Sequence, residues 1–301
     1  MLKRPNIIEW VIQKTAMVAF LGLFLFHSAF AAPLVKGIYI TQGTMEDTPY
    51  LSYLIQHAKA AGISTFIVDL ERPSERYHEN LALLKQNQIT YVVRIVMFPG
   101  GGTTAQITNP SYWQRKYNLV KQAIDWGVAQ VQLDYIRYDT HRPASAQNAR
   151  DVLKIIKWYK ERIPQNVPLQ LDIFGIASFG PSLHIGQDIK LFGSTANVIC
   201  PMVYPSHFEP FRQHAVTPYE TIYEALSSIK EQYPDEKLPF KLYPFIELSN
   251  YRFHLSHEKR LAYIVAEIRA VEEAGADGWY VWSPNNEYDV LFEVLSKQKV
   301  K

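Results

Sequence analysis

Strand-like and helix-like segments alternate eight times along this 301-residue chain, and that order constrains its fold more than any other feature. Regular alternation of strands and helices favours a parallel sheet that is covered by the helices connecting its strands. The predicted strands span residues 37–41, 65–70, 91–97, 130–134, 169–174, 198–204, 240–246 and 279–282. The predicted helices span residues 50–61, 78–87, 111–126, 144–162, 184–192, 219–232, 258–274 and 288–296.

Helix boundaries carry clear sequence signals. A capping side chain followed by proline at the first helical position is typical of a helix start, and a glycine in the left-handed conformation often ends one. The predicted starts are Thr48-Pro49, Asn109-Pro110 and Thr217-Pro218, and the predicted ends are Gly62, Gly127 and Gly275.

Connections that leave a strand are longer than those that enter one, as expected for a (β/α)8 TIM barrel whose site-forming loops follow the strands. An open doubly wound sheet is the alternative. It is disfavoured because no glycine-rich dinucleotide turn follows the first strand. Gly100-Gly101-Gly102 follows the third strand without a Walker lysine, so we interpret it as a flexible loop. Residues 32–301 are predicted to form one domain.

Residues 1–31 have the composition of a signal peptide. Lys3, Arg4 and Lys14 precede the apolar run 16–26, and Ala29-Phe30-Ala31 matches a cleavage signal. We expect export to the periplasm or the extracellular space, with no stable membrane insertion after cleavage. An uncleaved anchor is the alternative, although a bilayer span needs about 20 apolar residues.

Charge and cysteine content exclude several classes. Residues 1–31 hold three of the 31 basic and one of the 29 acidic residues, so residues 32–301 are formally neutral. A neutral domain lacks the basic stripe of a nucleic-acid binder. Cys200 is the single cysteine and lies in an apolar run, which indicates a buried structural thiol. We expect a monomer.

The triplet Gln132-Leu133-Asp134 recurs as Gln170-Leu171-Asp172 at the end of the next predicted strand. Alternate side chains of a strand point to opposite faces. Leu133 and Leu171 should therefore face the helices, and both aspartates should face the barrel interior. Two carboxyl groups at neighbouring strand ends suggest paired carboxylate chemistry.

The same parity predicts a set of inward-facing residues at one end of the barrel. It comprises Tyr39, Asp69, Glu71, Arg94, Asp134, Asp172, Tyr204, Glu247 and Trp282. Structural alternatives remain for its members. Asp134 could pair with Arg137 or Arg94 to close the barrel, and Asp172 could cap a loop. Asp69 and Glu71 could form local salt bridges, and the aromatic residues could be core rather than sugar-stacking surfaces.

Other catalytic classes lack their motifs. No His-Glu-x-x-His or zinc-ligand spacing occurs, and no Gly-x-Ser-x-Gly elbow is present. We therefore expect neither a metal site nor a cofactor. His207, which follows the sixth predicted strand, could bind a substrate hydroxyl or hold its loop.

Several segments together resemble a family of otherwise uncharacterised bacterial domains with a TIM-barrel fold, grouped as glycoside hydrolases. The resemblance implies that fold and sugar-cleaving activity, and it adds Arg137, His207 and Asn285 to the candidates for substrate binding. One departure is Glu71, where such domains often carry lysine. The segments that carry the resemblance are residues 36–41, 132–138, 172–175, 200–208 and 279–286.

Glycoside hydrolysis needs two carboxyl groups at the scissile bond. We predict Asp134 as nucleophile or stabiliser, Asp172 as the acid and Glu247 as the second candidate for the acid, acting on a cell-envelope or extracellular polysaccharide. A non-catalytic sugar-binding barrel is one alternative. A lyase or isomerase that binds a hard cation through Asp69, Asp134 and Asp172 is another.

Overall fold

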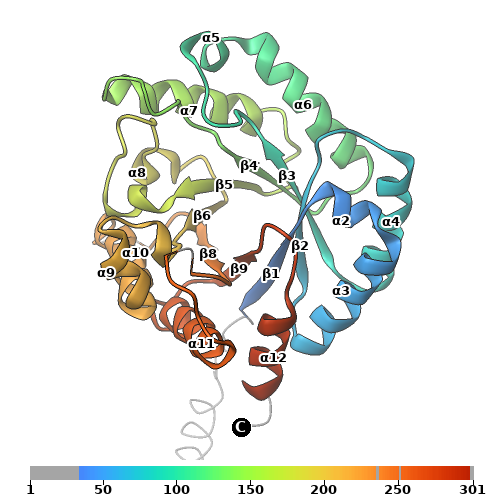
Figure 1. Cartoon of the computed structure of the whole chain (residues 1–301). Coiled ribbons are helices and arrows are strands. Elements are labelled where there is room, and N and C mark those ends of the chain that lie inside the picture. The colour runs from blue at the N-terminus through green and yellow to red at the C-terminus, as the bar shows by residue number, and fades with distance from the viewer. Residues whose placement is uncertain (1–33, 235–236, 251, 299–301) are drawn as a thin grey trace, which may run out of the picture. The chain divides into compact units, whose positions relative to one another are not determined.

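Parallel strands form a closed barrel with helices around its outside in the computed structural model, which describes residues 34–234, 237–250 and 252–298 (Figure 1). The order of pairing runs from β1 to β6, and β9 closes the barrel against β1. The predicted (β/α)8 barrel is confirmed, whereas the predicted signal peptide lies outside the described residues. The strands are β1 (Val35–Ile40), β2 (Thr65–Asp69), β3 (Thr90–Val96), β4 (Gln130–Asp134), β5 (Leu169–Phe174), β6 (Val198–Met202), β7 (Lys241–Leu242), β8 (Phe245–Glu247) and β9 (Gly278–Trp282).

The seventh position of the barrel is divided between β7 and β8, where the sequence predicted one strand. Proline has no N–H to donate to a ladder, and Pro244 lies at the break. Leu242 pairs with Ile199 of β6 before the break, and Phe245 pairs with Met202 after it. The barrel is thus closed by two short pieces rather than a continuous strand.

The predicted long helices are all present except that of residues 184–192, of which only the last turn forms. The short helices that follow strands were not predicted, because one turn leaves no periodic pattern. In the described part of the chain, no helix is long and apolar enough to cross a bilayer. The helices are α2 (Gln42–Glu46), α3 (Thr48–Ala61), α4 (Glu75–Gln86), α5 (Thr104–Ile107), α6 (Pro110–Asp125), α7 (Ala146–Lys160), η1 (Gly175–Phe179), α8 (Ile189–Phe192), η2 (Pro205–His207), α9 (Phe211–Val216), α10 (Pro218–Glu231), α11 (His257–Glu273) and α12 (Asp289–Gln298).

Helix caps follow the sequence signals with two corrections. Asn109 caps α6 as predicted, by accepting from the N–H of Ser111. Helix α3 is capped by Asp47 rather than Thr48, because the Asp47 carboxylate accepts from a first-turn N–H. Thr217 precedes α10 without a side-chain capping bond. The helix-ending glycines all have positive φ as predicted, namely Gly62, Gly127 and Gly275.

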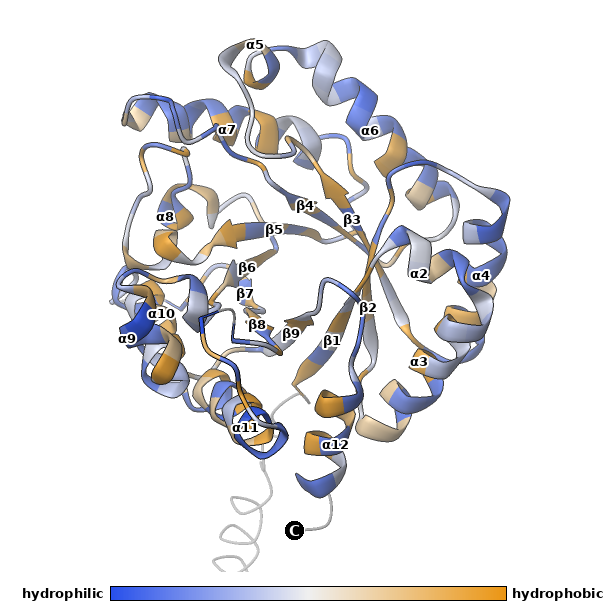
Figure 2. Ribbon diagram, in the orientation of Figure 1, coloured by the Kyte–Doolittle hydropathy of each residue, from blue (hydrophilic) through white to orange (hydrophobic). Residues whose placement is uncertain are grey.

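Strand parity separates two apolar layers. Leu133 and Leu171 pack in the larger cluster between strands and helices. A smaller cluster fills the barrel interior and includes Tyr39, Cys200 and Tyr280. Figure 2 shows that the strands are largely hydrophobic, while the helices mix hydrophobic and hydrophilic residues. Cys200 is fully buried, as predicted, and burial raises the pKa of its thiol well above the usual value.

Candidate active site

A cavity of about 960 Å³ opens where the strands end and the loops after them begin. This volume lies near the top of the range of small-molecule sites. Most predicted inward-facing residues line it, including Tyr39, Arg94, Asp134, Asp172 and Trp282. The site therefore lies at the carboxyl-terminal end of the barrel, where TIM-barrel enzymes carry theirs.

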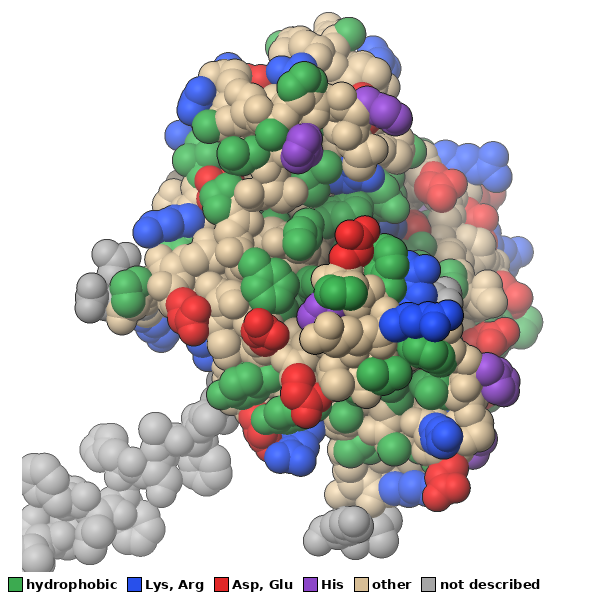
Figure 3. All heavy atoms as spheres, turned by 60° about the vertical axis from the view of Figure 1, so that its left-hand side comes forward, with side chains coloured by type: hydrophobic (Ala, Val, Ile, Leu, Met, Phe, Trp, Pro, Cys, Tyr) green, Lys and Arg blue, Asp and Glu red, His purple; other side chains and the backbone are tan. Residues whose placement is uncertain are grey.

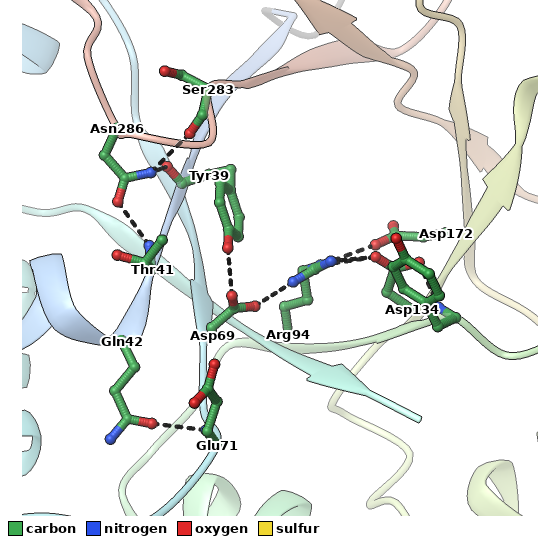
Figure 4. Close-up of polar contacts among 11 residues, drawn as sticks. Tyr39, Thr41, Gln42, Asp69, Glu71, Arg94, Asp134, Asp172, Ser283 and Asn286 are labelled. Carbon is green, nitrogen blue, oxygen red and sulfur yellow. Dashed lines mark hydrogen bonds and ion pairs between the residues drawn. The ribbon is translucent and has the colours of Figure 1, made fainter. Parts of the chain in front are cut away.

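Arg94 is the centre of the charged cluster at the cavity floor. It projects from β3 and forms ion pairs with Asp69 of β2 and Asp134 of β4. Its Nε also lies 3.1 Å from Oδ2 of Asp134 and 3.5 Å from Oδ2 of Asp172. Figure 4 shows Asp134 and Asp172 side by side at one end of the guanidinium and Asp69 at the other.

The register of the strands explains this arrangement. Asp69 of β2 is the partner of Arg94 on β3, so their side chains emerge side by side. Asp134 and Asp172 end equivalent triplets on β4 and β5, which pair in register through Leu133 and Leu171. Neighbouring strands lie about 4.8 Å apart, so one guanidinium can reach all three carboxylates.

Burial and neighbouring charges set the protonation of the cluster. Burial, together with the charge of Asp134, raises the pKa of Asp172 well above its usual value, although Arg94 opposes the shift. Burial also raises the pKa of Asp69 against the effect of Arg94. For Arg94, burial lowers the pKa but the carboxylates outweigh it, so its pKa is raised and the charge persists.

Tyr39 and Asn286 support the cluster from β1 and the loop after β9. The Tyr39 hydroxyl donates to Oδ2 of Asp69 at 2.5 Å. The Asn286 amide donates to the Tyr39 carbonyl at 3.1 Å and accepts from the Thr41 N–H at 2.8 Å. These bonds join the first and last strand positions (Figure 4). Sequence reasoning missed Asn286, whose φ of 57° suits asparagine.

Aromatic residues also form part of the cavity wall. The rings of Tyr204 and Trp282 stack with centroids 5.4 Å apart and an interplanar angle of 25°. Both residues and His207 line the cavity, as predicted. The stacked pair offers the flat apolar surface on which sugar rings pack.

A family model described as "Putative glycosyl hydrolase domain" matches residues 102–288, which is more than half of the chain. The chain belongs to this glycosyl hydrolase family. The match covers β4, β5 and β6, and with them Asp134, Asp172 and Tyr204. No curated protein gives a match.

Solved structures share the barrel at low sequence identity. The spore cortex-lytic enzyme SleL of Bacillus cereus aligns with a TM-score of 0.62 at 12% identity, over 87% of this chain and 73% of that one. The endo-beta-1,4-mannanase of Thermotoga petrophila also gives 0.62 at 12%, over 88% and 76%. A chitinase of Bacteroides thetaiotaomicron gives 0.60 at 11%, over 89% and 96%. These likenesses show the shared TIM-barrel fold.

Glu247 is not brought to the cavity of this glycosyl hydrolase domain. It is fully buried, and its carboxylate accepts from the N–H of Ser206 at 2.9 Å and the hydroxyl of Ser206 at 2.8 Å. His207 Nδ1 lies 3.5 Å from it. Strand parity did not predict this burial, because β8 ends at Glu247 and η2 packs against the carboxylate through Ser206. Glu247 therefore holds the loop that carries His207.

Other predicted contacts also lie away from the cavity wall. Glu71 and Asn285 are exposed and do not line it, and Asp69 lies behind Arg94. Arg137 forms no ion pair with Asp134. Its guanidinium packs instead over the rings of Tyr135 and Phe174.

The glycine-rich segment after β3 is ordered by its neighbours rather than a free loop. The Gly102 N–H donates to the Arg137 carbonyl at 2.8 Å, and the Asp139 N–H donates to the Gly102 carbonyl at 3.1 Å. Gly101 has a φ of 105°, and a Cβ there would lie 2.6 Å from the Tyr138 carbonyl oxygen. Glycine is required because two backbones meet at this point.

The cavity has further lining residues that were not predicted from the sequence, and most of them lie beyond the strand ends. Aromatic residues close after each aspartate were a usable signal: Tyr135 follows Asp134, and Phe174 lies two residues beyond Asp172. Exposed large apolar side chains include Ile176 and Phe179 of η1, Val216 of α9 and Tyr223 of α10. Figure 3, in which the left-hand side of Figure 1 comes forward, shows hydrophobic side chains interspersed with acidic and other ones. The further lining residues include Tyr135, Thr140, Phe174, Gly175, Ile176, His184 and Phe208.

Proposed function

We propose that this domain hydrolyses glycosidic bonds of a polysaccharide or oligosaccharide, using Asp134 and Asp172 as its two carboxyl groups. The observation that carries the proposal is that both carboxyl groups line one cavity and share Arg94, while burial and the charge of Asp134 raise the pKa of Asp172. Glycoside hydrolysis requires one carboxyl group that donates a proton and a second that attacks the sugar or activates water.

Asp172 is the proposed general acid. Burial and the neighbouring charge of Asp134 raise its pKa, which favours the protonated form that a general acid needs. Oδ1 of Asp172 is buried and has no hydrogen-bond partner among the described residues, so a proton on this oxygen is not donated to another protein group. Asp172 thus donates a proton as the bond to the leaving sugar breaks.

Asp134 is the proposed nucleophile. Its Oδ2 is paired with Arg94, which compensates a negative charge on the carboxylate. Both Oδ2 atoms lie within 3.5 Å of Arg94 Nε, which limits their separation to roughly 7 Å and suits the short spacing of about 5 Å in retaining enzymes. Asp134 would attack the anomeric carbon, and water would later release the sugar with Asp172 acting as base.

The cavity also bears on the two alternatives. A non-catalytic sugar-binding barrel would be favoured by lumen carboxylates separated by well over about 10 Å, and Asp134 and Asp172 are closer than that. A cation site at Asp69, Asp134 and Asp172 would compete with Arg94, which already contacts all three. No metal-binding group of three or more His, Cys, Asp or Glu occurs in the described part of the chain.

We also propose that the substrate is a cell-envelope or extracellular polysaccharide. The support is the sequence of residues 1–31, in which an apolar run follows basic residues and precedes Ala29-Phe30-Ala31. Fractionation of cells that produce the full chain tests this part. Recovery of the chain only in the cytoplasm would contradict it.

The experiment compares the wild-type domain with Asp134→Asn and Asp172→Asn on peptidoglycan, chitin and mannan, with release of reducing sugar as the readout. Loss of a catalytic carboxyl group lowers kcat by about 10²–10⁴-fold, so both variants should be nearly inactive while remaining folded by circular dichroism. Glu71→Gln is the matched control, because Glu71 is exposed outside the cavity. Wild-type activity in Asp134→Asn would refute the assignment.

A further inference from the structure

Tyr135 holds a backbone conformation that few residues of its type adopt. Its φ is 50°, in the left-handed region that disfavours bulky side chains. The other non-glycine residues with positive φ in the described part of the chain are Asn286, a residue type that tolerates it, and Gln88, which follows the last turn of α4. Such strain persists where surrounding structure enforces it, and it clusters at functional sites.

The strained backbone places the Tyr135 ring on the cavity wall beside Phe174. The two rings meet edge to face, with centroids 5.8 Å apart and an interplanar angle of 87°. Both line the cavity. We call this pair the Tyr135–Phe174 wall. Tyr135 directly follows β4 and Phe174 ends β5, the two strands that carry Asp134 and Asp172.

Arg137 packs against both rings of the Tyr135–Phe174 wall and does not itself line the cavity. Its guanidinium carbon lies 5.3 Å from the Tyr135 ring centroid and 4.5 Å from that of Phe174. Its Nη1 donates to the Tyr138 carbonyl at 2.8 Å. A Cβ at Gly101 would lie 2.7 Å from Nη1, so the glycine leaves room for the guanidinium. Arg137 is 6% exposed and does not line the cavity, so it supports the rings rather than offering charge to a ligand.

We propose that the Tyr135–Phe174 wall is a second sugar-binding surface, so that sugar rings bind on both sides of the cleaved bond. This inference rests on the proposed function. Tyr204 precedes η2 and Trp282 ends β9, and both pairs of rings line the same cavity as the carboxyl groups of Asp134 and Asp172. A substrate that contacts both surfaces is an oligosaccharide cleaved at an internal bond.

Three features favour this role over a purely structural one. The Tyr135 ring is partly exposed in the cavity instead of filling the core. The backbone strain is retained although glycine would relieve it. The cavity volume of about 960 Å³ lies near the top of the range of ligand sites and so leaves room for more than one sugar ring. The predicted ligands are neutral glycan chains, because both arginines near the wall are already engaged.

The test separates backbone strain from ring contact by comparing Tyr135→Gly with Gln88→Gly. Both changes place glycine at a positive φ, which favours the folded state. We expect neither to lower Tm, whereas Tyr135→Gly should raise KM for a hexasaccharide about tenfold with kcat changed less than threefold. Phe174→Ala should act in the same direction. The probes are the hexamers of N-acetylglucosamine, glucose and mannose, with binding measured by calorimetry in the Asp134→Asn background.

Product lengths supply a second readout. Binding on both sides of the carboxyl groups predicts that a hexamer yields di-, tri- and tetrasaccharides. Release of monosaccharide alone would overturn the inference, as would unchanged KM in both Tyr135→Gly and Phe174→Ala. If the wild-type domain bound a hexamer without cleaving it, the proposed function would be contradicted, but a sugar-binding role of the Tyr135–Phe174 wall would still be supported. Failure of the wild-type domain to bind any of the three hexamers would overturn the wall itself.

Discussion

At the scale of single residues, a shifted pKa does not by itself mark the catalytic acid. Asp172 and Glu267 are both completely buried carboxyl groups. Burial and then a neighbouring carboxylate raise the pKa of each well above the usual value, the neighbour being Asp134 for one and Glu247 for the other. Only Asp172 lines the cavity. Access to substrate therefore distinguishes the two groups.

This contrast gives a prediction on stability and pH. A carboxyl group whose pKa is raised by folding must hold a proton that the unfolded chain releases above about pH 4. Its contribution to the free energy of unfolding therefore falls as pH rises from about 4 to the raised pKa. Asp172→Asn and Glu267→Gln remove the ionisable group and with it this pH-dependent fall in the free energy of unfolding. Each variant should therefore have a Tm about 2–4 °C above that of the wild type at pH 7. Near pH 4 the Tm values of variant and wild type should be equal.

Calorimetric scans from pH 4 to pH 8 measure the Tm difference between each variant and the wild type. Sugar release measures whether each carboxyl group is needed for catalysis. Glu267→Gln should keep full activity, while Asp172→Asn should lose it. A Tm gap that stays constant across the pH range would contradict the proposed linkage. Equal loss of activity in both variants would contradict the distinction between the two carboxyl groups.

At the scale of elements, sequence periodicity predicted the regular parts of the barrel and strand parity predicted much of its interior. Leu133 and Asp134 face opposite sides because a strand alternates its side chains. Parity failed for Glu247, where β8 ends and Ser206 of η2 donates its N–H and hydroxyl to the carboxylate. It also missed Tyr135 and Asn286, whose left-handed conformations depend on packing between loops distant in sequence.

Asn286 supplies the prediction that belongs to this scale. It is fully buried, and its amide bonds join the loop after β9 to Tyr39 and Thr41 of the first strand position. Asn286→Ala removes the acceptor of the Thr41 N–H, leaves the Tyr39 carbonyl only its bond from the Tyr288 hydroxyl, and places alanine at a positive φ. We expect a loss of about 2–4 kcal/mol in the free energy of unfolding.

Chemical denaturation of Asn286→Ala beside Asn285→Ala measures this contribution. Asn285 is adjacent but exposed, so its substitution should change stability by less than about 0.5 kcal/mol. Equal stability of the two variants would mean that the barrel closes without the Asn286 bonds. A rise in KM for Asn286→Ala is also expected, since Tyr39 lines the cavity.

At the scale of the whole molecule, acidic and basic residues balance over the domain, whereas the cavity lining holds more acidic than basic residues. Residues 32–301 are formally neutral, yet the cavity lining includes Asp134, Asp172 and Glu209 with Arg94 as its only lysine or arginine. Arg94 is already paired with carboxylates, Asp69 included. The molecule thus has no strong long-range field, and selection by charge must occur within the cavity.

An acidic glycan should therefore bind much more weakly than a neutral one of equal length. We expect hexagalacturonate to bind at least about tenfold more weakly than the best neutral hexamer at low ionic strength, because its carboxylates meet a negative cavity with no free guanidinium. Added salt at about 1 M shortens the screening length to about 3 Å, so the difference in affinity between hexagalacturonate and the neutral hexamer should become smaller. Calorimetry with the Asp134→Asn variant measures both affinities without cleavage. Equal affinity at low salt would mean that Arg94 leaves its carboxylates to bind the ligand, which would also contradict its proposed role beside Asp134.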